Sequence, residues 1–251
     1  MAHLHAVILA GGPMHRATGG PRTLLAVRGT PLLGYAIDLA ERFEPEFITV
    51  VAGEGAEQIA AFAGPRAQVL RQVGELGSGH AVALAVEARR RTDGELLVIY
   101  ADRIFLREET LRSLLGARRH GRAAALLSVN LERPAGYSRI IRDFDGQVLR
   151  ASSDCEVNQK ESRIREVVAG AYSFDIASLR EVLPPAATIE RKTNLTEFVG
   201  PLVAHGHQVV ALAASDPAET RGIYSEEEAL QAELLTIPSL RAPNGRGTLG
   251  S

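Results

Sequence analysis

His5-Ala6-Val7-Ile8-Leu9 is an apolar run near the start of the chain, and it leads directly into Ala10-Gly11-Gly12-Pro13-Met14-His15-Arg16. Such a run predicts a buried strand. The glycines after it lack the Cβ that would keep a ligand away from the backbone, and their N–H groups can face an anion. Arg16 and Arg22 add fixed positive charge nearby. This stretch therefore predicts a sheet whose first strand ends at a site for a nucleoside triphosphate.

Strand patterns and helix patterns alternate through the first half of the chain. The expected strands are Leu4–Leu9, Phe47–Val51, Ala67–Leu70 and Leu96–Tyr100. The expected helices are Pro31–Phe43, Glu54–Phe62, Ser78–Arg91 and Glu108–Arg119. This alternation is typical of a parallel sheet covered by helices. We therefore expect an α/β fold with a doubly wound, mostly parallel sheet of the Rossmann-like kind.

After about Ala123 the pattern changes to strands that follow one another. The expected strands are Ala124–Leu131, Ser138–Arg142, Gln147–Ala151 and Val167–Phe174, with a hairpin turn at Asp145-Gly146. Helical patterns return at Asn194–Ala204 and Ser225–Leu235. These patterns predict a mixed sheet with a small β-rich lobe in a single domain, 1–237, whose halves are about 1–122 and 123–237. The tail 238–251 is expected to be disordered.

The composition is that of a globular chain with no signature of nucleic-acid or membrane binding. The 251 residues are 45% hydrophobic and 23% charged, with a formal net charge of -2. This balance favours neither nucleic acid nor an anionic membrane as a partner. Cys155 is the only cysteine, which excludes an internal disulfide and a thiolate metal cluster. Because there is no leader pattern and no long apolar run, we expect a cytoplasmic protein. We also expect it to be a monomer or a dimer.

Two further segments follow strands whose carboxyl ends meet at the same edge of a parallel sheet. Gln72 precedes a glycine-rich run, and its amide is suited to reading the edge of a base. Gly77 and Ser78 leave room for a ribose close to the backbone. Asp102 follows an apolar strand, where a carboxylate can hold Mg²⁺ against phosphates.

The same residues have plainer interpretations. The loop Gly11–Arg22 is also compatible with an ordinary strand-to-helix turn. Asp102 has Arg103 and Arg107 close in sequence, and an ion pair with either is the alternative to a ligand role. Lys192 is expected to be a solvated charge rather than a ligand.

Five motifs occur in a fixed order. They are Leu9-Ala10-Gly11-Gly12 with Arg16, Pro21-Arg22-Thr23-Leu24-Leu25, Gly29-Thr30-Pro31-Leu32-Leu33, Gln72 with Leu76–Ala81, and Tyr100-Ala101-Asp102. In this combination the chain resembles the sugar-1-phosphate nucleotidyltransferase superfamily, from Ala6 to about Glu233. The middle is most similar to the uridylyltransferase domain that makes UDP-N-acetylglucosamine. The loop near Arg16 is more similar to the molybdopterin guanylyltransferase branch.

The resemblance implies a reaction. A phosphate oxygen of a sugar phosphate, or of a similar acceptor, would attack the α-phosphorus of a nucleoside triphosphate, and pyrophosphate would leave. Positioning and charge neutralisation supply most of the rate of such a transfer. UTP is the first expectation for the nucleotide, with CTP and GTP open. The alternative is a binding or regulatory protein of the same fold that has lost turnover.

The resemblance also implies roles for single residues. Arg16, Arg22 and Asp102 would be catalytic, and Asp102 would bind the cofactor Mg²⁺. The first half would bind the nucleotide and the second half the acceptor. The nucleotide-binding residues would be Leu9, Ala10, Gly11, Gly12, Gln72, Gly77 and Ser78. The acceptor-binding residues would be Ser138, Ser153, Val168 and Thr196.

Several residues depart from the pattern of the superfamily. Arg22 stands where the superfamily usually has a catalytic lysine, so a planar fork replaces a compact ammonium group. Tyr224 stands where the uridylyltransferases have the asparagine that completes the Mg²⁺ shell, and Met14 replaces a small residue. A phenol is a poor Mg²⁺ ligand, which leaves Asp216 and Glu226 as substitute ligands.

Three residues on the acceptor side also differ. Ser138 replaces a glycine, Ser153 a glutamate and Val168 an asparagine, and those residues contact the amino sugar in the relatives. Loss of such hydrogen-bond partners commonly removes roughly 10⁴-fold of discrimination. The sequence therefore argues against N-acetylglucosamine-1-phosphate as the acceptor.

Overall fold

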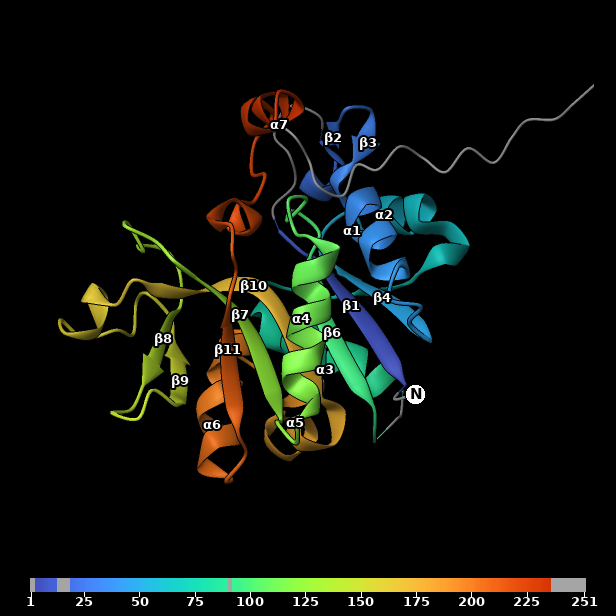
Figure 1. Ribbon diagram of the computed structural model, residues 1–251. Helices are drawn as coiled ribbons and strands as arrows, with labels where there is room; N and C mark the ends of the chain where they lie inside the picture. Colours follow the sequence, from blue (N-terminus) through green and yellow to red (C-terminus); the bar gives the residue numbers. More distant parts are fainter. Residues whose placement is uncertain (1–2, 13–18, 90–91, 236–251) are drawn as a thin grey trace, which may run out of the picture.

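The computed structural model describes residues 3–12, 19–89 and 92–235. Arg16 and Met14, and the tail 238–251 that was expected to be disordered, lie outside these residues. Within them a nine-stranded mixed sheet forms the centre of the molecule (Figure 1). Its strands are β1 (Leu4–Ala10), β4 (Phe47–Ala52), β5 (Gln68–Arg71), β6 (Glu95–Tyr100), β7 (Ala124–Asn130), β8 (Arg139–Arg142), β9 (Val148–Ser152), β10 (Glu166–Asp175) and β11 (Val209–Ala213). The main path of the sheet runs β11-β7-β10-β6-β1-β4-β5.

The first half of the chain supplies the parallel part of the sheet. β1 pairs in parallel with β4 on one side and with β6 on the other, and β5 extends the row beyond β4. Leu9 is opposite both Val51 and Tyr100, so the carboxyl ends of these strands are level with one another. All seven residues of β1 are buried, as the apolar run predicts. The expected doubly wound sheet is confirmed.

β10 makes the sheet mixed. It is antiparallel to both β6 and β7, while β7 and β11 are parallel to each other. β8 and β9 form the expected hairpin, which is attached to the main sheet where Arg139 pairs with Val167 and makes the small β-rich lobe (Figure 1). The sequence patterns did not predict β11 or the helix after β10. That helix begins at Ile176 and is capped by Asp175, whose side chain accepts a hydrogen bond from the Ser178 N–H.

Helices cover both faces of the sheet, because side chains along each strand point alternately to opposite sides. Ala6 and Ile8 pack on the face that is covered by α1 (Leu32–Glu41), α2 (Ala56–Ala63) and α4 (Glu108–Arg119). Val7 and Leu9 pack on the other face, under α3 (Gly77–Ala88), α5 (Ile176–Val182) and α6 (Val199–Ala204). α4 lies in front of the sheet and α3 behind it in Figure 1.

A third, smaller apolar cluster lies beyond the carboxyl edge of the sheet. There α7 (Glu226–Glu233) packs on the short hairpin of β2 (Ala26–Val27) and β3 (Thr30–Pro31), which the sequence patterns missed. Arg28 in the hairpin turn donates to the carbonyl oxygens of Glu233 and Leu235. Among the helices of the described residues, none is long and apolar enough to cross a membrane.

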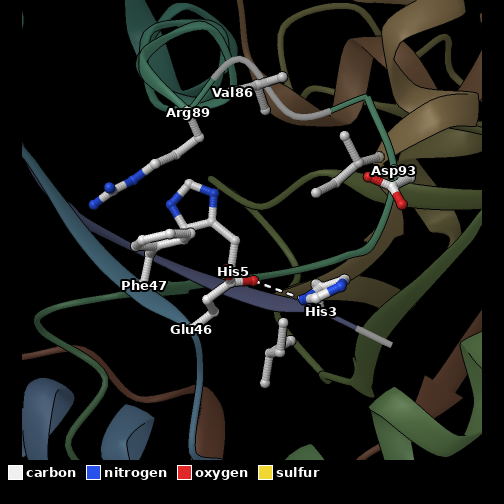
Figure 2. A pocket seen from close by; sticks show the side chains of 9 residues that line it. His3, His5, Glu46, Phe47, Val86, Arg89 and Asp93 are labelled. Atoms are coloured by element: carbon white, nitrogen blue, oxygen red, sulfur yellow. Dashed lines mark ion pairs between the residues drawn. The ribbon is translucent and has the colours of Figure 1, made fainter. Parts of the chain in front are cut away.

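At the opposite edge, the amino ends of β1 and β4 enclose a cavity of only about 10 Å³. Figure 2 shows His5, Phe47 and Arg89 side by side there, with His3 paired to Glu46. The Arg89 guanidinium carbon lies 4.0 Å from the centre of the Phe47 ring. His5 Nε2 is 2.9 Å from the Thr49 hydroxyl. Burial, and the positive charge of Arg89 to a smaller extent, lower the pKa of His5 from 6.5 to about 4.

This buried histidine predicts a pH-dependent stability. Because the unfolded chain takes up the His5 proton between pH 6.5 and about 4 and the folded chain does not, the free energy of unfolding decreases as the pH falls through that window. The full shift corresponds to about 3 kcal/mol. Urea unfolding of the parent and of His5→Phe at pH 7 and pH 4 measures it. We expect a smaller pH dependence in the variant, and an identical dependence would contradict the prediction.

Candidate active site

The main cleft lies at the carboxyl ends of β1, β4, β5 and β6 and has a volume of about 630 Å³. Its position is the usual ligand site of an open α/β sheet. The residues that line it come from both halves of the chain. They are Leu9, Gly11, Gly12, Val51, Gly53, Glu54, Arg71, Gln72, Val73, Gly74, Glu75, Gly77, Ser78, Ala81, Tyr100, Lys192 and Asn194. Ala10 is buried at the end of β1 and is not one of them.

The two glycines after β1 each lie beside another predicted site residue. A Cβ on Gly11 would lie 3.8 Å from Gln72 Oε1, and a Cβ on Gly12 would lie 3.2 Å from Arg22 Nη2. The missing side chains thus leave the backbone of this turn open toward the Gln72 amide on one side and the Arg22 guanidinium on the other. The predicted phosphate site also includes Arg16, which lies outside the described residues.

The amide of Gln72 is held in one orientation. Its Nε2 donates to the Gly77 carbonyl oxygen at 2.9 Å and lies 2.9 Å from Nδ1 of His80. Burial lowers the pKa of His80, which favours the neutral ring in which Nδ1 can accept that hydrogen bond. Both amide hydrogens of Gln72 are therefore used inside the protein. Only Oε1, on the side of Gly11, is left as an acceptor for a ligand.

The start of α3 joins the two halves of the chain. The Gly79 N–H donates to the Thr193 carbonyl oxygen at 2.8 Å, and the Thr193 N–H donates to the Leu76 carbonyl oxygen at 2.9 Å. The Leu195 N–H donates to the Ser78 hydroxyl oxygen at 2.9 Å. Ser78 thus has two roles: it lines the main cleft, and it holds the second half of the chain beside that cleft.

Asp102 lies between two arginines. Its side chain is 9% exposed, with Oδ2 3.3 Å from Arg22 Nη2 and Oδ1 3.6 Å from Arg103 Nε. Burial raises the pKa of Asp102, and the two guanidinium groups oppose that change. Within the described residues, Asp102 Oδ1 and the Nε atoms of both arginines have no hydrogen-bond partner. Of the two pairings considered from sequence, the structure shows the one with Arg103. Arg107 instead pairs with Asp216 at 2.6 Å.

A resident Mg²⁺ does not fit this arrangement. Both oxygens of Asp102 face guanidinium groups, and Asp216 is bound to Arg107. Glu228, whose negative charge contributes to the raised pKa of Asp102, accepts a hydrogen bond from the Tyr224 N–H. The described parts of the chain hold no group of three His, Cys, Asp or Glu side chains that could bind a metal ion.

Three of the four predicted acceptor residues lie together. The Ser138 hydroxyl is 3.4 Å from the Thr196 hydroxyl, and the Ser138 carbonyl accepts the Val168 N–H at 2.9 Å. Ser153 is instead held within its own turn, where its hydroxyl donates to Glu156 at 2.6 Å. None of these residues lines the main cleft, so any acceptor they contact lies beside it.

Sequence reasoning missed two contributions to the site. Lys192 lines the main cleft, although it was expected to be a solvated charge. One signal was present, because Lys192 is one of only two lysines in the chain and lies four residues before Thr196, a predicted acceptor-binding residue. The second is the contact of Arg103 with Tyr224, which depends on the path of the chain after β6, since only the pairing of Arg103 with Asp102 was considered from the sequence.

Known proteins are similar to this sequence over most of its length. The family described as "MobA-like NTP transferase domain" matches residues 6–224. The "Bifunctional protein GlmU" of Enterococcus faecalis is 34% identical over 227 residues, which cover 89% of this chain and 50% of the relative. A protein of the same name from Thermus thermophilus is 34% identical over 244 residues, which cover 96% of this chain and 53% of the relative. The chain spans about half the length of these curated relatives.

A solved structure shows the same fold. It is described as a putative glucose-1-phosphate thymidylyltransferase from Bacillus anthracis in complex with sucrose, and it superposes with a TM-score of 0.69. The likeness covers 92% of this chain and 94% of that chain at 18% sequence identity. The match to residues 6–224 establishes that the chain belongs to the MobA-like NTP transferase domain family, within the sugar-1-phosphate nucleotidyltransferase superfamily that its motifs resemble.

Proposed function

We propose that the chain transfers UMP from UTP to a sugar phosphate or a similar phosphorylated small molecule. A phosphate oxygen of the acceptor forms a bond to the α-phosphorus, and the bond from that phosphorus to the leaving pyrophosphate breaks. The glycine turn and Arg22 hold the phosphates, and the first turn of α3 lies at the nucleoside. The family membership and the convergence of Gly12, Gln72 and Arg22 support this proposal.

The fixed amide of Gln72 is the observation that carries the choice of base. With Nε2 committed to Gly77 and His80, Oε1 can only accept a hydrogen bond from the base. The ring N3–H of uracil is a donor, whereas N3 of cytosine is an acceptor. Guanine also carries a ring N–H, and cytosine and adenine carry exocyclic amino donors, so GTP, CTP and ATP are the competing nucleotides that an assay must include.

Mg²⁺ remains a prediction from the resemblance. Since the residues around Asp102 do not fit a resident ion, a Mg²⁺ ion in the reaction would arrive with the triphosphate. The transfer described above needs this chain only to position the two substrates and to neutralise charge.

Pyrophosphate release tests the proposal. The purified chain would be incubated with UTP, GTP, CTP or ATP, with Mg²⁺ and with a panel of sugar phosphates. We expect release with UTP and at least one acceptor. Failure of every pair, together with no stabilisation of the fold by UTP, would contradict both the reaction and the nucleotide site.

Gln72→Ala is predicted to weaken UTP binding. Loss of one hydrogen bond to the base should raise the Kd by about tenfold, corresponding to about 1.4 kcal/mol. CTP should be affected less, so the ratio of the two dissociation constants should fall. Calorimetric titration of the parent and the variant measures both, and Gln68→Ala on β5 is the control for loss of a glutamine outside the cleft lining. An unchanged ratio would show that Gln72 does not read the base.

A second candidate function is nucleotide binding without turnover. The ion pair between Arg22 and Asp102 favours it, because each group already has a partner inside the protein. A ligand at 100 times its Kd stabilises a fold by about 2.7 kcal/mol whether or not it reacts. Stabilisation by UTP with no pyrophosphate release from any acceptor would therefore select this second function.

A further inference from the structure

The guanidinium of Arg22 fills the space between the glycine turn and Asp102. Its Nη2 is 3.3 Å from Asp102 Oδ2, and the same nitrogen would lie 3.2 Å from a Cβ on Gly12. Only 18% of the Arg22 side chain is exposed. A metal ion that joined Asp102 to phosphates at this turn would have to occupy the same space.

Arg103 lies near the other oxygen of Asp102, and a hydrogen bond to a backbone carbonyl holds it there. Its Nη1 donates to the Thr220 carbonyl oxygen, and its side chain is 12% exposed. The guanidinium carbons of Arg103 and Arg22 lie 5.7 Å and 5.0 Å from the centre of the Tyr224 ring. Tyr224 therefore contacts both cations, which favours their staying on either side of the carboxylate.

Arg22, Arg103 and Asp102 form a cluster whose charges are opposite to those of a metal-binding site. Two guanidinium groups face the Asp102 carboxylate, and the charge of Glu228 acts on Asp102 less than either of them, so the immediate contacts of Asp102 are cationic before any ligand binds. A dication at Asp102 would be repelled by both neighbours in a partly desolvated setting, whereas phosphate oxygens would be attracted. Guanidinium groups also match the geometry of phosphate oxygens.

We propose that Arg22 and Arg103 take the place of the divalent cation, so that this chain binds a nucleoside triphosphate without Mg²⁺. The inference rests on the proposed function, because it assumes that the triphosphate occupies the main cleft. It assigns Arg103 and Tyr224 a role at the phosphates, and it gives Asp102 the role of holding two arginines instead of a metal ion.

Calorimetric titration with UTP, in excess EDTA and in saturating Mg²⁺, tests the inference. We expect the two dissociation constants to differ by less than about tenfold. A larger loss of affinity in EDTA would overturn the inference and leave the proposed function standing. If UTP bound in neither buffer, the proposed function itself would fail.

The UTP affinity of Asp102→Asn distinguishes a site in which Asp102 holds two arginines from one in which Asp102 holds a metal ion. If Asp102 holds the arginines, removing its charge frees them for the phosphates, and UTP should bind in EDTA with the parent affinity or about threefold to tenfold more tightly. If Asp102 holds a metal ion, the variant should lose UTP affinity in Mg²⁺, which would overturn the inference. Asp145→Asn in the exposed β8–β9 turn is the matched control.

Arg103→Gln tests the second cation while keeping a donor for the Thr220 carbonyl. Its UTP affinity in EDTA should fall by about tenfold, because one cation is lost from the phosphates. Arg163→Ala, an exposed position outside the cleft lining, controls for the change in net charge. Equal thermal unfolding of the variant and the parent would show that the loss is local. An Arg103→Gln affinity equal to that of the parent would overturn the role given to Arg103.

Discussion

Replacing Arg22 by alanine is expected to lower kcat/KM for pyrophosphate release from UTP by about 10²–10³-fold. Arg22 lies between the glycine turn and Asp102, where it can stabilise the negative charge that develops on the phosphates. Its loss also leaves Asp102 buried with one cation instead of two. The parent and Arg22→Ala would be compared at several UTP concentrations with the best acceptor from the panel.

Arg71→Ala is the matched control for this experiment. Arg71 lines the main cleft, which Arg22 itself does not, and its guanidinium faces the exposed Glu57 at 3.3 Å, with both side chains more than half exposed. Exposed pairs of this kind contribute little to stability, and we expect a change of no more than about threefold in kcat/KM. Arg22→Lys keeps the charge and loses the planar fork, so its rate should lie between those of the parent and Arg22→Ala. Equal rates for Arg22→Ala and Arg71→Ala would contradict the role of Arg22.

The parallel half of the fold could be predicted because its signals are local. β1, β4 and β6 are short apolar runs, and each predicted boundary lies within one residue of the observed one. The carboxyl ends of such strands meet by necessity, which brings Gly12, Gln72 and Asp102 to one edge of the sheet. This part of the site followed from sequence order and strand direction alone.

The second half was harder to predict because tertiary contacts decide it. Val209–Ala213 is a short apolar run that becomes β11 by pairing with β7. The antiparallel place of β10 between β6 and β7 also depends on partners that are distant in sequence. The same holds for a short segment of the first half, where Pro31 was expected to be the first residue of a helix. Pro31 pairs with Ala26 in a two-stranded hairpin, and the helix begins one residue later, at Leu32.

Side-chain partners were the least predictable feature of the site. The motif that contains Arg22 predicts a cation at the phosphates, but it does not show that this cation pairs with Asp102. Lys192 reaches the cleft only because Thr193 is bound to the start of α3. Such contacts combine loops from both halves of the chain, and no periodic pattern in the sequence encodes them.

The contact between α3 and Thr193 leads to the largest expected effect on stability. Gly77 has a φ of +82°, and a Cβ there would overlap the Thr193 carbonyl oxygen and lie 3.0 Å from its carbonyl carbon and its backbone nitrogen. The obstacle is backbone, so no side-chain rotation can relieve it. Gly77→Ala is therefore expected to lower the free energy of unfolding by about 3–4 kcal/mol, from the strained φ and the overlap together. Urea unfolding measures this loss.

Gly74→Ala separates the two causes. Gly74 has a similar φ of +78° and also lines the cleft, but a Cβ there would meet only Leu76 Cγ, at 3.9 Å. We expect a loss of about 1–2 kcal/mol from the backbone conformation alone. Gly77→Ala should also weaken UTP binding by more than about tenfold, since Ser78 and Lys192 are positioned by the same contact, whereas Gly74→Ala should retain most of the affinity. If the two variants lost equal stability and equal affinity, the contact between α3 and Thr193 would not be what holds the second half of the chain at the nucleotide.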